Sequence, residues 1–98
     1  MKTSSFNVAG VVFEGRQGIL DRLYMYGSEH DVSLCAEPEN KYDKDAVAVY
    51  CQNFKIGYVP RAINRSIKRL RIHSPKAVIN YSKDLRVYSA TVQFEKEE

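Results

Sequence analysis

The stretch that decides the fold is residues 36–50, which read AEPENKYDKDAVAVY. It opens with a cluster of turn-forming residues, 37–41, that includes Pro38. Proline fixes its own φ and lacks a backbone donor, so a strand that precedes it should end there. The stretch closes on the apolar run 46–50, which is typical of a buried strand. We therefore expect a strand, an ordered polar loop and a second strand.

The expected loop carries an aromatic residue directly before an acidic one, Tyr42 and Asp43. Asn40, Asp43 and Asp45 belong to the residue types that bond their own backbone and tolerate turn geometry. Two interpretations are open. Either the loop only connects two strands, as most polar turns do, or it presents Tyr42 and Asp43 to a ligand.

Length and composition indicate one soluble domain with a modest core. The chain has 98 residues, of which 44% are hydrophobic, and this argues against disorder. Its net charge of +3 allows a nucleic-acid partner without requiring one. No stretch approaches the roughly 20 apolar residues that a membrane-spanning helix needs.

Two cysteines, Cys35 and Cys51, fall in expected strands. A disulfide between neighbouring strands is one possibility. Two thiols without an N-terminal apolar run of signal length are more typical of a reducing compartment. We expect the cytoplasm of a bacterium or of a phage-infected cell.

The N-terminal half predicts a strand over 6–13, with Gly10 marking a bulge or a close backbone approach. A turn over 15–18 leads into a helix with apolar residues at helical spacing between 19 and 26. Gly27 is the expected end of that helix. Alternation over 32–37 then predicts a half-buried strand.

The C-terminal half predicts a hairpin over 46–58 that turns at Gln52-Asn53. A second helix begins near Pro60 and ends at Ser74-Pro75. Strands follow over 77–81 and 85–94, and the acidic end, 95–98, reads as a frayed tail.

These elements predict a mainly β (α+β) fold: a small six-stranded, partly open OB-like barrel with two helices. We expect a single domain over 1–98 with its core at about 6–94. Periodic spacing places six residues in the core: Val47, Val49, Ile56, Ile67, Val87 and Val92.

Enzyme chemistry finds little support in the sequence. There is no phosphate-binding glycine loop followed by Lys-Ser/Thr. A zinc site from His30, Cys35, Cys51 and His73 would need four residues without metal-ligand spacing to converge. The paired carboxylates of the 37–45 loop are more typical of loop acids than of a metal or acid–base pair. We expect no catalytic residue, no metal and no cofactor.

Nucleic-acid binding has a physical basis in the second helix, which is basic and free of acids. Arg61, Arg65 and Arg69 recur near i, i+4 spacing. They form either a track for phosphates or a solvated face opposite the buried stripe. Binders of single strands combine such a track with aromatic rings that stack on bases. The candidate rings, each of which could equally belong to the core, are Phe13, Tyr42, Tyr58, Tyr81 and Tyr88.

Three blocks of sequence carry a family resemblance: GVVFEGRQ over 10–17, EPxNxYDxxAVxV over 37–49 and IGYVPR over 56–61. In this order they resemble the HIRAN domain, and the chain is similar to members that stand alone in bacteria and phages. The resemblance runs from about Phe6 to the last strand. It implies an OB-like barrel, in agreement with the elements expected above.

The resemblance also implies a pocket for the unpaired 3′ end of single-stranded DNA. It assigns Asp43 to the terminal 3′-hydroxyl, Tyr42 to the terminal nucleotide and Asn40 to the region of the base. Phe13 matches the aromatic after the first strand, and Arg61 matches a basic residue that meets phosphate.

The sequence departs from the family pattern at three positions. Val12 replaces an arginine, Phe13 replaces a tyrosine, and Tyr58 stands where the eukaryotic domain has a histidine. Arg16 and Gln17, in the adjacent turn, are candidates to replace the missing contacts.

We therefore predict a module that binds single-stranded DNA at its 3′-hydroxyl end, in repair, replication or phage–host conflict. A helicase or nuclease encoded separately is a possible partner, and a monomer is favoured. The alternatives are a protein-interaction or structural barrel that binds no DNA, and an accessory domain of a nuclease or helicase system. The predicted nucleic-acid-binding residues are Phe13, Arg16, Asn40, Tyr42, Asp43, Tyr58, Arg61 and Arg65.

Overall fold

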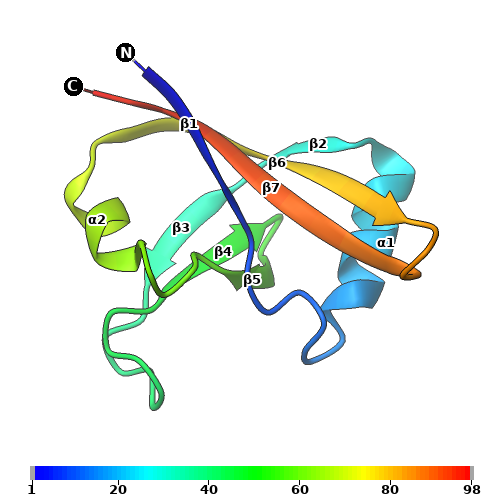
Figure 1. Ribbon diagram of the computed structural model, residues 1–98, viewed down its shortest axis with the longest axis horizontal. Coiled ribbons are helices and arrows are strands. Elements are labelled where there is room, and N and C mark those ends of the chain that lie inside the picture. Colours follow the sequence, from blue (N-terminus) through cyan, green and yellow to red (C-terminus); the bar gives the residue numbers. More distant parts are fainter. Residues whose placement is uncertain (1, 98) are drawn as a thin grey trace.

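The computed structural model describes residues 2–97 and contains seven strands and two helices (Figure 1). In chain order the elements are β1 (Lys2–Asn7), α1 (Arg16–Tyr26), β2 (Glu29–Asp31), β3 (Ser33–Ala36), β4 (Val47–Cys51), β5 (Phe54–Tyr58), α2 (Asn64–Arg69), β6 (Ile72–Ser82) and β7 (Val87–Lys96). The prediction of a mainly β, α+β domain with two helices is confirmed.

The strands form two antiparallel sheets, one in the order β1-β7-β6-β2 and the other in the order β3-β4-β5. They do not close into a barrel, but the arrangement is compatible with an OB-like fold. Only Val32 separates β2 from β3, so one run of chain passes from the first sheet into the second. At the other edge of each sheet, a β-bridge joins Ala9, which follows β1, to Tyr58 of β5.

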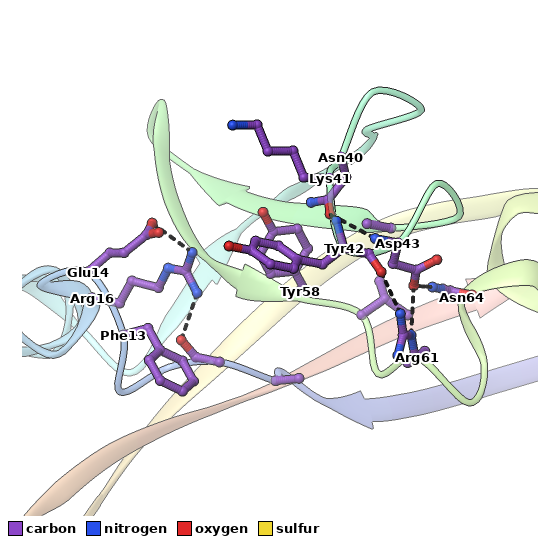
Figure 2. A pocket seen from close by; sticks show the side chains of 14 residues that line it. Phe13, Glu14, Arg16, Asn40, Lys41, Tyr42, Asp43, Tyr58, Arg61 and Asn64 are labelled. Atoms are coloured by element: carbon purple, nitrogen blue, oxygen red, sulfur yellow. Dashed lines mark hydrogen bonds and ion pairs between the residues drawn. The ribbon is translucent and has the colours of Figure 1, made fainter.

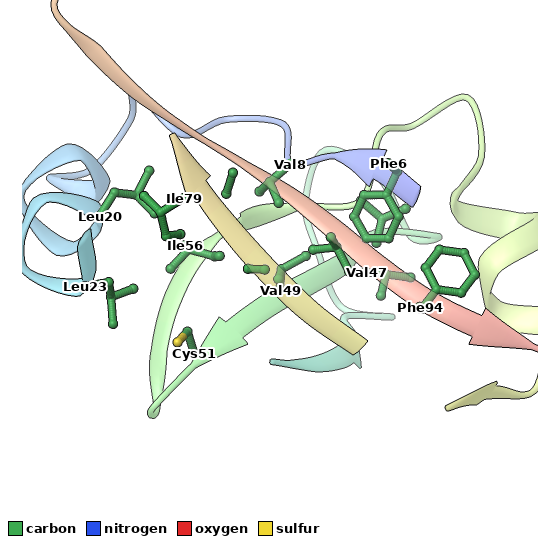
Figure 3. Packing of buried hydrophobic residues seen from close by; sticks show 14 of the residues in the cluster. Phe6, Val8, Leu20, Leu23, Val47, Val49, Cys51, Ile56, Ile79 and Phe94 are labelled. Carbon is green, nitrogen blue, oxygen red and sulfur yellow. The ribbon is translucent and has the colours of Figure 1, made fainter. Parts of the chain in front are cut away.

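The hydrophobic core lies between the two sheets and under α1 (Figure 3). Val49, Ile56 and Val92 are fully buried, and Val47 and Ile67 are nearly so, as predicted. Val87 is only half-buried, because it stands at the start of β7, beside the β6–β7 turn.

The β4–β5 hairpin follows the prediction closely. Gln52 and Asn53 have φ values of 50° and 71°. Positive φ at both central positions is the geometry of the two-residue turn that matches the twist of paired strands. Asparagine tolerates this conformation better than most residues, so the pair Gln52-Asn53 fixes the register of the hairpin.

The strand count was predicted one too low because β2 gives no strand signal. Its residues, Glu29, His30 and Asp31, are all polar and show no alternation with apolar residues. They nevertheless pair with residues 76–78 of β6. Pairing with a long neighbouring strand, rather than local propensity, makes this segment a strand.

The first strand was predicted at the wrong place. Sequence alternation indicated residues 6–13, but β1 covers 2–7 and the chain then leaves the sheet. Gly10, Glu14 and Gly15 adopt φ values of 74°, 54° and 73°, which lie far from those of a regular strand. Residues 10–15 therefore form a loop, and α1 begins at Arg16, earlier than expected, and ends as predicted before Gly27.

The C-terminal boundaries also differ from the prediction. Helix α2 ends at Arg69, and Ser74-Pro75 does not stop a helix but forms an irregularity inside β6, where Ser74 has φ 51°. Strand β7 continues to Lys96, with Glu95 paired to Thr3. Glu95 and Lys96 of the expected frayed tail are thus part of the sheet, and its last residue, 98, lies outside the described residues.

Neither described helix is long and apolar enough to cross a membrane. Cys35 and Cys51 are both free thiols. Cys35 stands opposite Ala48 in the β3–β4 ladder, so the two cysteines are out of register for a disulfide.

Candidate functional site

An open pocket of about 720 Å³ lies at the end of the sheets where two loops face each other across β5 (Figure 2). One wall is the loop 10–15, and the other is the loop 37–45. The segment 59–64, between β5 and the start of α2, closes one end. The volume falls within the range of about 300–1,000 Å³ that is usual for ligand sites.

The loop 10–15 reaches the pocket because the chain before it passes very close to β5. Ala9 and Tyr58 exchange two backbone hydrogen bonds, of 2.8 and 2.9 Å. A side chain at Gly57 would not fit, since its Cβ would stand 2.4 Å from both the Ala9 oxygen and Val8 Cγ1. Gly57 therefore allows the approach that brings Phe13 to the pocket.

Two side chains at the start of α1 hold the loop 10–15. Arg16 is only 5% exposed and donates from Nη1 to the Gly10 carbonyl at 2.8 Å. Gln17 donates from Nε2 to the carbonyls of Val11 and Tyr88, and its Oε1 accepts from the Tyr88 N–H. Gln17 is thus used to fix the loop and does not line the pocket.

The buried guanidinium of Arg16 also supports the floor of the pocket. It lies 5.3 Å from the centre of the Tyr58 ring, within the range of a cation–π contact. Its Nη2 pairs with the exposed carboxylate of Glu14 at 3.1 Å. Two of its nitrogens are therefore engaged within the protein, which restricts it to a fixed position.

The hydroxyl of Tyr58 belongs to a polar network below the ring. It donates to Glu37 Oε1 at 2.9 Å, while Lys55 Nζ pairs with Glu37 Oε2 at 2.7 Å. Burial alone would raise the pKa of Glu37, but the bonds from Lys55, Asn40 and Tyr58 outweigh it and hold that pKa below its usual value. The ring is thereby fixed between the two walls.

Asn40 shapes the loop 37–45. Its Oδ1 accepts from the backbone N–H groups of Tyr42 and Asp43, at 2.9 and 3.0 Å. Its Nδ2 donates to Glu37 Oε1 at 3.0 Å. This is the local bonding that the sequence predicts for asparagine in a turn. It leaves the Tyr42 side chain projecting into solvent, 89% exposed.

Asp43 is held from three directions. Its Oδ1 accepts from the Asp45 N–H at 2.9 Å, and its Oδ2 accepts from Asn64 Nδ2 at 2.8 Å and from Arg61 Nε at 3.4 Å. Led by the backbone bond from Asp45, these contacts lower the pKa of Asp43. The carboxylate is therefore ionised at neutral pH, and it also makes the contact expected of an aspartate that caps its own loop.

Arg61 and Asn64 tie this wall to the start of α2. Arg61 donates from Nη2 to the Tyr42 carbonyl at 2.6 Å, although most of its side chain is exposed. Asn64 is buried, and the sequence analysis did not identify it. Asparagine is a poor residue for a helix, so its place at the first turn of α2 was the available signal that its side chain has a partner.

The basic face of α2 is partly occupied by acids of the loop 37–45. Arg65 Nε and Lys68 Nζ each lie 2.9 Å from an Asp45 oxygen. The bond from Lys68, followed by that from Arg65, lowers the pKa of Asp45 to about 2. The predicted stripe is also interrupted, because Arg61 precedes the helix.

Of the predicted site residues, seven line the pocket and one does not. Phe13, Arg16, Asn40, Tyr42, Asp43, Tyr58 and Arg61 converge there, whereas Arg65 lies outside it against Asp45. The pocket also includes Glu14, Lys41 and Asn64, which the sequence did not single out.

The other candidate groups lie elsewhere. Tyr81 and Tyr88 form a ring cluster with Tyr24 of α1. His30 lies against the carbonyls of Leu23 and Gly27, and His73 contacts Glu97. Within residues 2–97 no three histidine, cysteine or acidic side chains come together in a group that could hold a metal ion.

Fold and pocket together define a small α+β binding module. The chain belongs to the HIRAN domain family, since the model of the HIRAN domain matches residues 1–96. HIRAN domains are nucleic-acid-binding modules and not catalytic domains.

Comparison with solved structures supports the same fold. The chain is similar to the crystal structure of the HIRAN domain of human HLTF, with a TM-score of 0.53 and 18% sequence identity. The match covers 98% of this chain and 77% of that one. No curated protein sequence matches the chain.

Proposed function

We propose that this protein binds single-stranded DNA in the pocket and holds its 3′-hydroxyl end there. The observation that carries the proposal is the placement of the exposed Tyr42 ring next to the ionised carboxylate of Asp43. The ring offers a face to a base, and the carboxylate offers an acceptor to a hydroxyl.

Stacking is supported by the two exposed rings of the pocket. Tyr42 and Phe13 are 89% and 64% exposed, and they belong to opposite walls (Figure 2). Large aromatic side chains are costly to leave in water, so two of them around one pocket favour a flat, apolar ligand surface. Stacking of one base on such a ring is worth roughly 1–3 kcal/mol and is tolerant of sequence.

Recognition of a hydroxyl is supported by the bonding capacity of Asp43. An ionised carboxylate offers about four acceptor positions. Three are used by Asp45, Asn64 and Arg61. About one acceptor remains for a ligand donor, and a terminal 3′-hydroxyl supplies one such donor. A terminal phosphate would instead bring negative charge against negative charge.

Phosphate contacts are supported by the exposed basic side chains at the pocket. Lys41 and Arg61 line it with most of their length in solvent. Glu14 opposes them on the other wall. The net attraction is modest, so we expect affinity to depend on the end contacts as well as on charge.

The test is a fluorescence titration with a short oligonucleotide carrying either a free 3′-hydroxyl or a 3′-phosphate. We expect wild-type protein to bind the 3′-hydroxyl oligonucleotide more tightly. Asp43→Asn should reduce the difference in affinity between the two oligonucleotides while the protein stays folded. Asp84→Asn, which removes a carboxylate from the exposed β6–β7 turn, is the control and should keep the preference. Equal binding of both ends by wild type would refute the proposal.

A protein-interaction role without DNA is the second candidate, and the ion pairs of α2 favour it. Arg65 and Lys68 are already paired with Asp45, so this part of the basic face is not free for phosphate. The salt dependence of oligonucleotide binding distinguishes the two candidate functions, because binding through phosphates weakens steeply as the salt concentration rises. Salt-independent binding, or none, would favour the second candidate.

The cellular setting follows from the proposed ligand. We propose that the protein handles DNA ends during repair, replication or phage–host conflict, together with a separately encoded helicase or nuclease. We place it in the cytoplasm, where an exposed thiol such as that of Cys35 stays reduced.

A further inference from the structure

The strand β3 carries an unpaired edge. Glu37 donates to the Ala46 carbonyl, and bonds between antiparallel strands recur at every second residue, so Cys35 and Ser33 also face β4. Leu34 and Ala36 therefore point their N–H and C=O groups away from the sheet. Among the described residues, the one hydrogen bond to these groups is from the Cys35 thiol to the Ala36 carbonyl, at 3.7 Å.

An apolar slot of about 340 Å³ runs beside this edge. Its near wall is β3 itself. Its far wall is formed by the end of α2 and the start of β6, and every apolar residue there is at least partly buried. The apolar lining includes Leu34 and Ala36 on the near side, and Ile67, Leu70, Ile72 and Pro75 on the far side.

The other strand edges lack this combination. Tyr58 of β5 already bonds to Ala9, and β2 is three residues long and carries two acids. The outer edge of β1 is polar, and neither the pocket described above nor this slot is lined by β1 residues. A free backbone edge beside an apolar slot occurs at β3, and it suits an extended segment that adds one strand to the sheet.

The charge at the slot selects the kind of segment. Lys68 lines it, and the segment 64–71 carries four basic residues and no acid. Asp45 and Glu97 compensate part of this charge, but no ion pair joins Arg69 to a described residue. Acidic side chains on the outer face of an added strand would meet this charge.

We propose that the β3 edge binds an extended, acidic segment of a partner protein, with alternate aliphatic side chains in the slot. Main-chain bonds to Leu34 and Ala36 would hold the segment, and the slot would select its side chains. A second copy of this chain is a poor occupant, because its own β3 is flanked by the same wall. The proposal is independent of DNA binding in the pocket.

The experiment uses the fluorescein-labelled peptide EIEVEVE as the probe and KIKVKVK as its charge control. We expect the acidic peptide to bind and the basic one not to. Ala36→Pro removes an outward N–H without touching the β4 ladder, and we expect it to weaken binding by about tenfold or more. Ser5→Pro is the matched control, since the Ser5 N–H points away from β7 and Ser5 does not line the slot.

Amide exchange gives a second readout that needs no variant. The peptide should slow exchange of the Leu34 and Ala36 N–H groups, while those of Ser33 and Cys35 are protected throughout. Several results would overturn the proposal: no binding of EIEVEVE, equal loss in Ser5→Pro, or protection of the same amides by an oligonucleotide. Protection that appears with protein concentration alone would assign the edge to self-association instead.

Discussion

The two walls of the pocket are held by different kinds of bond. The loop 10–15 is fixed from α1 by Arg16 and Gln17, which bond mainly to backbone carbonyls. The loop 37–45 is fixed to α2 and to the segment before it by charged pairs: Arg61 pairs with Asp43, and Arg65 and Lys68 pair with Asp45. The loop 10–15 therefore depends on its close packing against α1 and β5, and the loop 37–45 depends on ion pairs.

The difference has consequences for what can disturb each wall. Bonds from a buried side chain to backbone carbonyls respond weakly to salt and to acid, whereas exposed ion pairs respond to both. A ligand that carries phosphates competes with the acids of the loop 37–45 for their basic partners. It does not compete with the backbone carbonyls that hold the loop 10–15. The wall 37–45 is therefore the responsive side of the pocket.

Breaking the packed wall should have the largest effect on stability. In Gly57→Ala the new Cβ would stand 2.4 Å from the Ala9 oxygen, so the backbone must move apart. We expect a loss of about 1–3 kcal/mol in the free energy of unfolding, measured by urea denaturation, and weaker oligonucleotide binding.

Gly18→Ala is the control for that change. Nothing lies within 4 Å of a Cβ at Gly18, which is inside α1. Alanine there should be neutral or stabilising by roughly 0.5–1 kcal/mol. An unchanged midpoint for Gly57→Ala would mean that the close approach of residues 8–9 does not hold the first wall.

The sequence predicted the wall 37–45 better than the wall 10–15. Asn40 and Asp43 are partly local signals, because Asn40 bonds to Tyr42 and Asp43 accepts from the Asp45 N–H, each two positions away. The hairpin that follows turns at Gln52-Asn53 as expected. Residues 10–13 of the other loop were predicted as the end of a strand. Their hydrophobic run, Val11 to Phe13, has the composition of a strand but depends on contacts with Gln17, which sequence patterns do not show.

Long-range partners account for most of what sequence could not supply. The contact of Asn64 with Asp43 joins residues 21 positions apart, and that of Lys68 with Asp45 joins residues 23 apart. Neither is visible in any local periodicity. The sequence therefore predicted the basic face of α2 either as free to bind phosphate or as solvated. In the structure, Arg65 and Lys68 of this face pair with Asp45, and these pairs help to hold the loop 37–45.

Acid should loosen one wall before the other. The pKa of Asp45 is about 2 in the folded protein, against 3.8 as its ordinary value. A lowered folded pKa means that the contribution of the ion pairs is complete above about pH 4 and is lost as pH falls through 2. We expect backbone amide shifts of residues 42–45 to change over this interval in NMR spectra, while those of 10–12, where two carbonyls accept from Arg16 and Gln17, stay constant.

The variant Asp45→Asn is the control. It keeps Asp43, which accepts from the residue 45 N–H, so a backbone step from Asp43 remains, but the Arg65 Nε–H signal should lose the step that Asp45 causes in wild type. If both loops changed together at one pH in wild type, the walls would not be held separately, and the contrast between packing and charge would fail.

The smallest expected effect concerns the salt dependence of oligonucleotide binding. Asp45→Asn keeps a hydrogen-bonding side chain but removes the charge that holds Arg65 and Lys68. Each cation that then reaches a phosphate of a single strand adds about 0.7 to the slope of log affinity against log salt, so two add up to roughly 1.4. Asp84→Asn changes the net charge equally but frees no cation near the pocket, and it should leave the slope unchanged. A steeper slope in Asp45→Asn alone would show that Asp45 keeps Arg65 and Lys68 from contacting phosphates in wild type. Equal slopes in all three proteins would mean that Arg65 and Lys68 serve only to fix the loop, and that phosphate contacts come from Lys41 and Arg61.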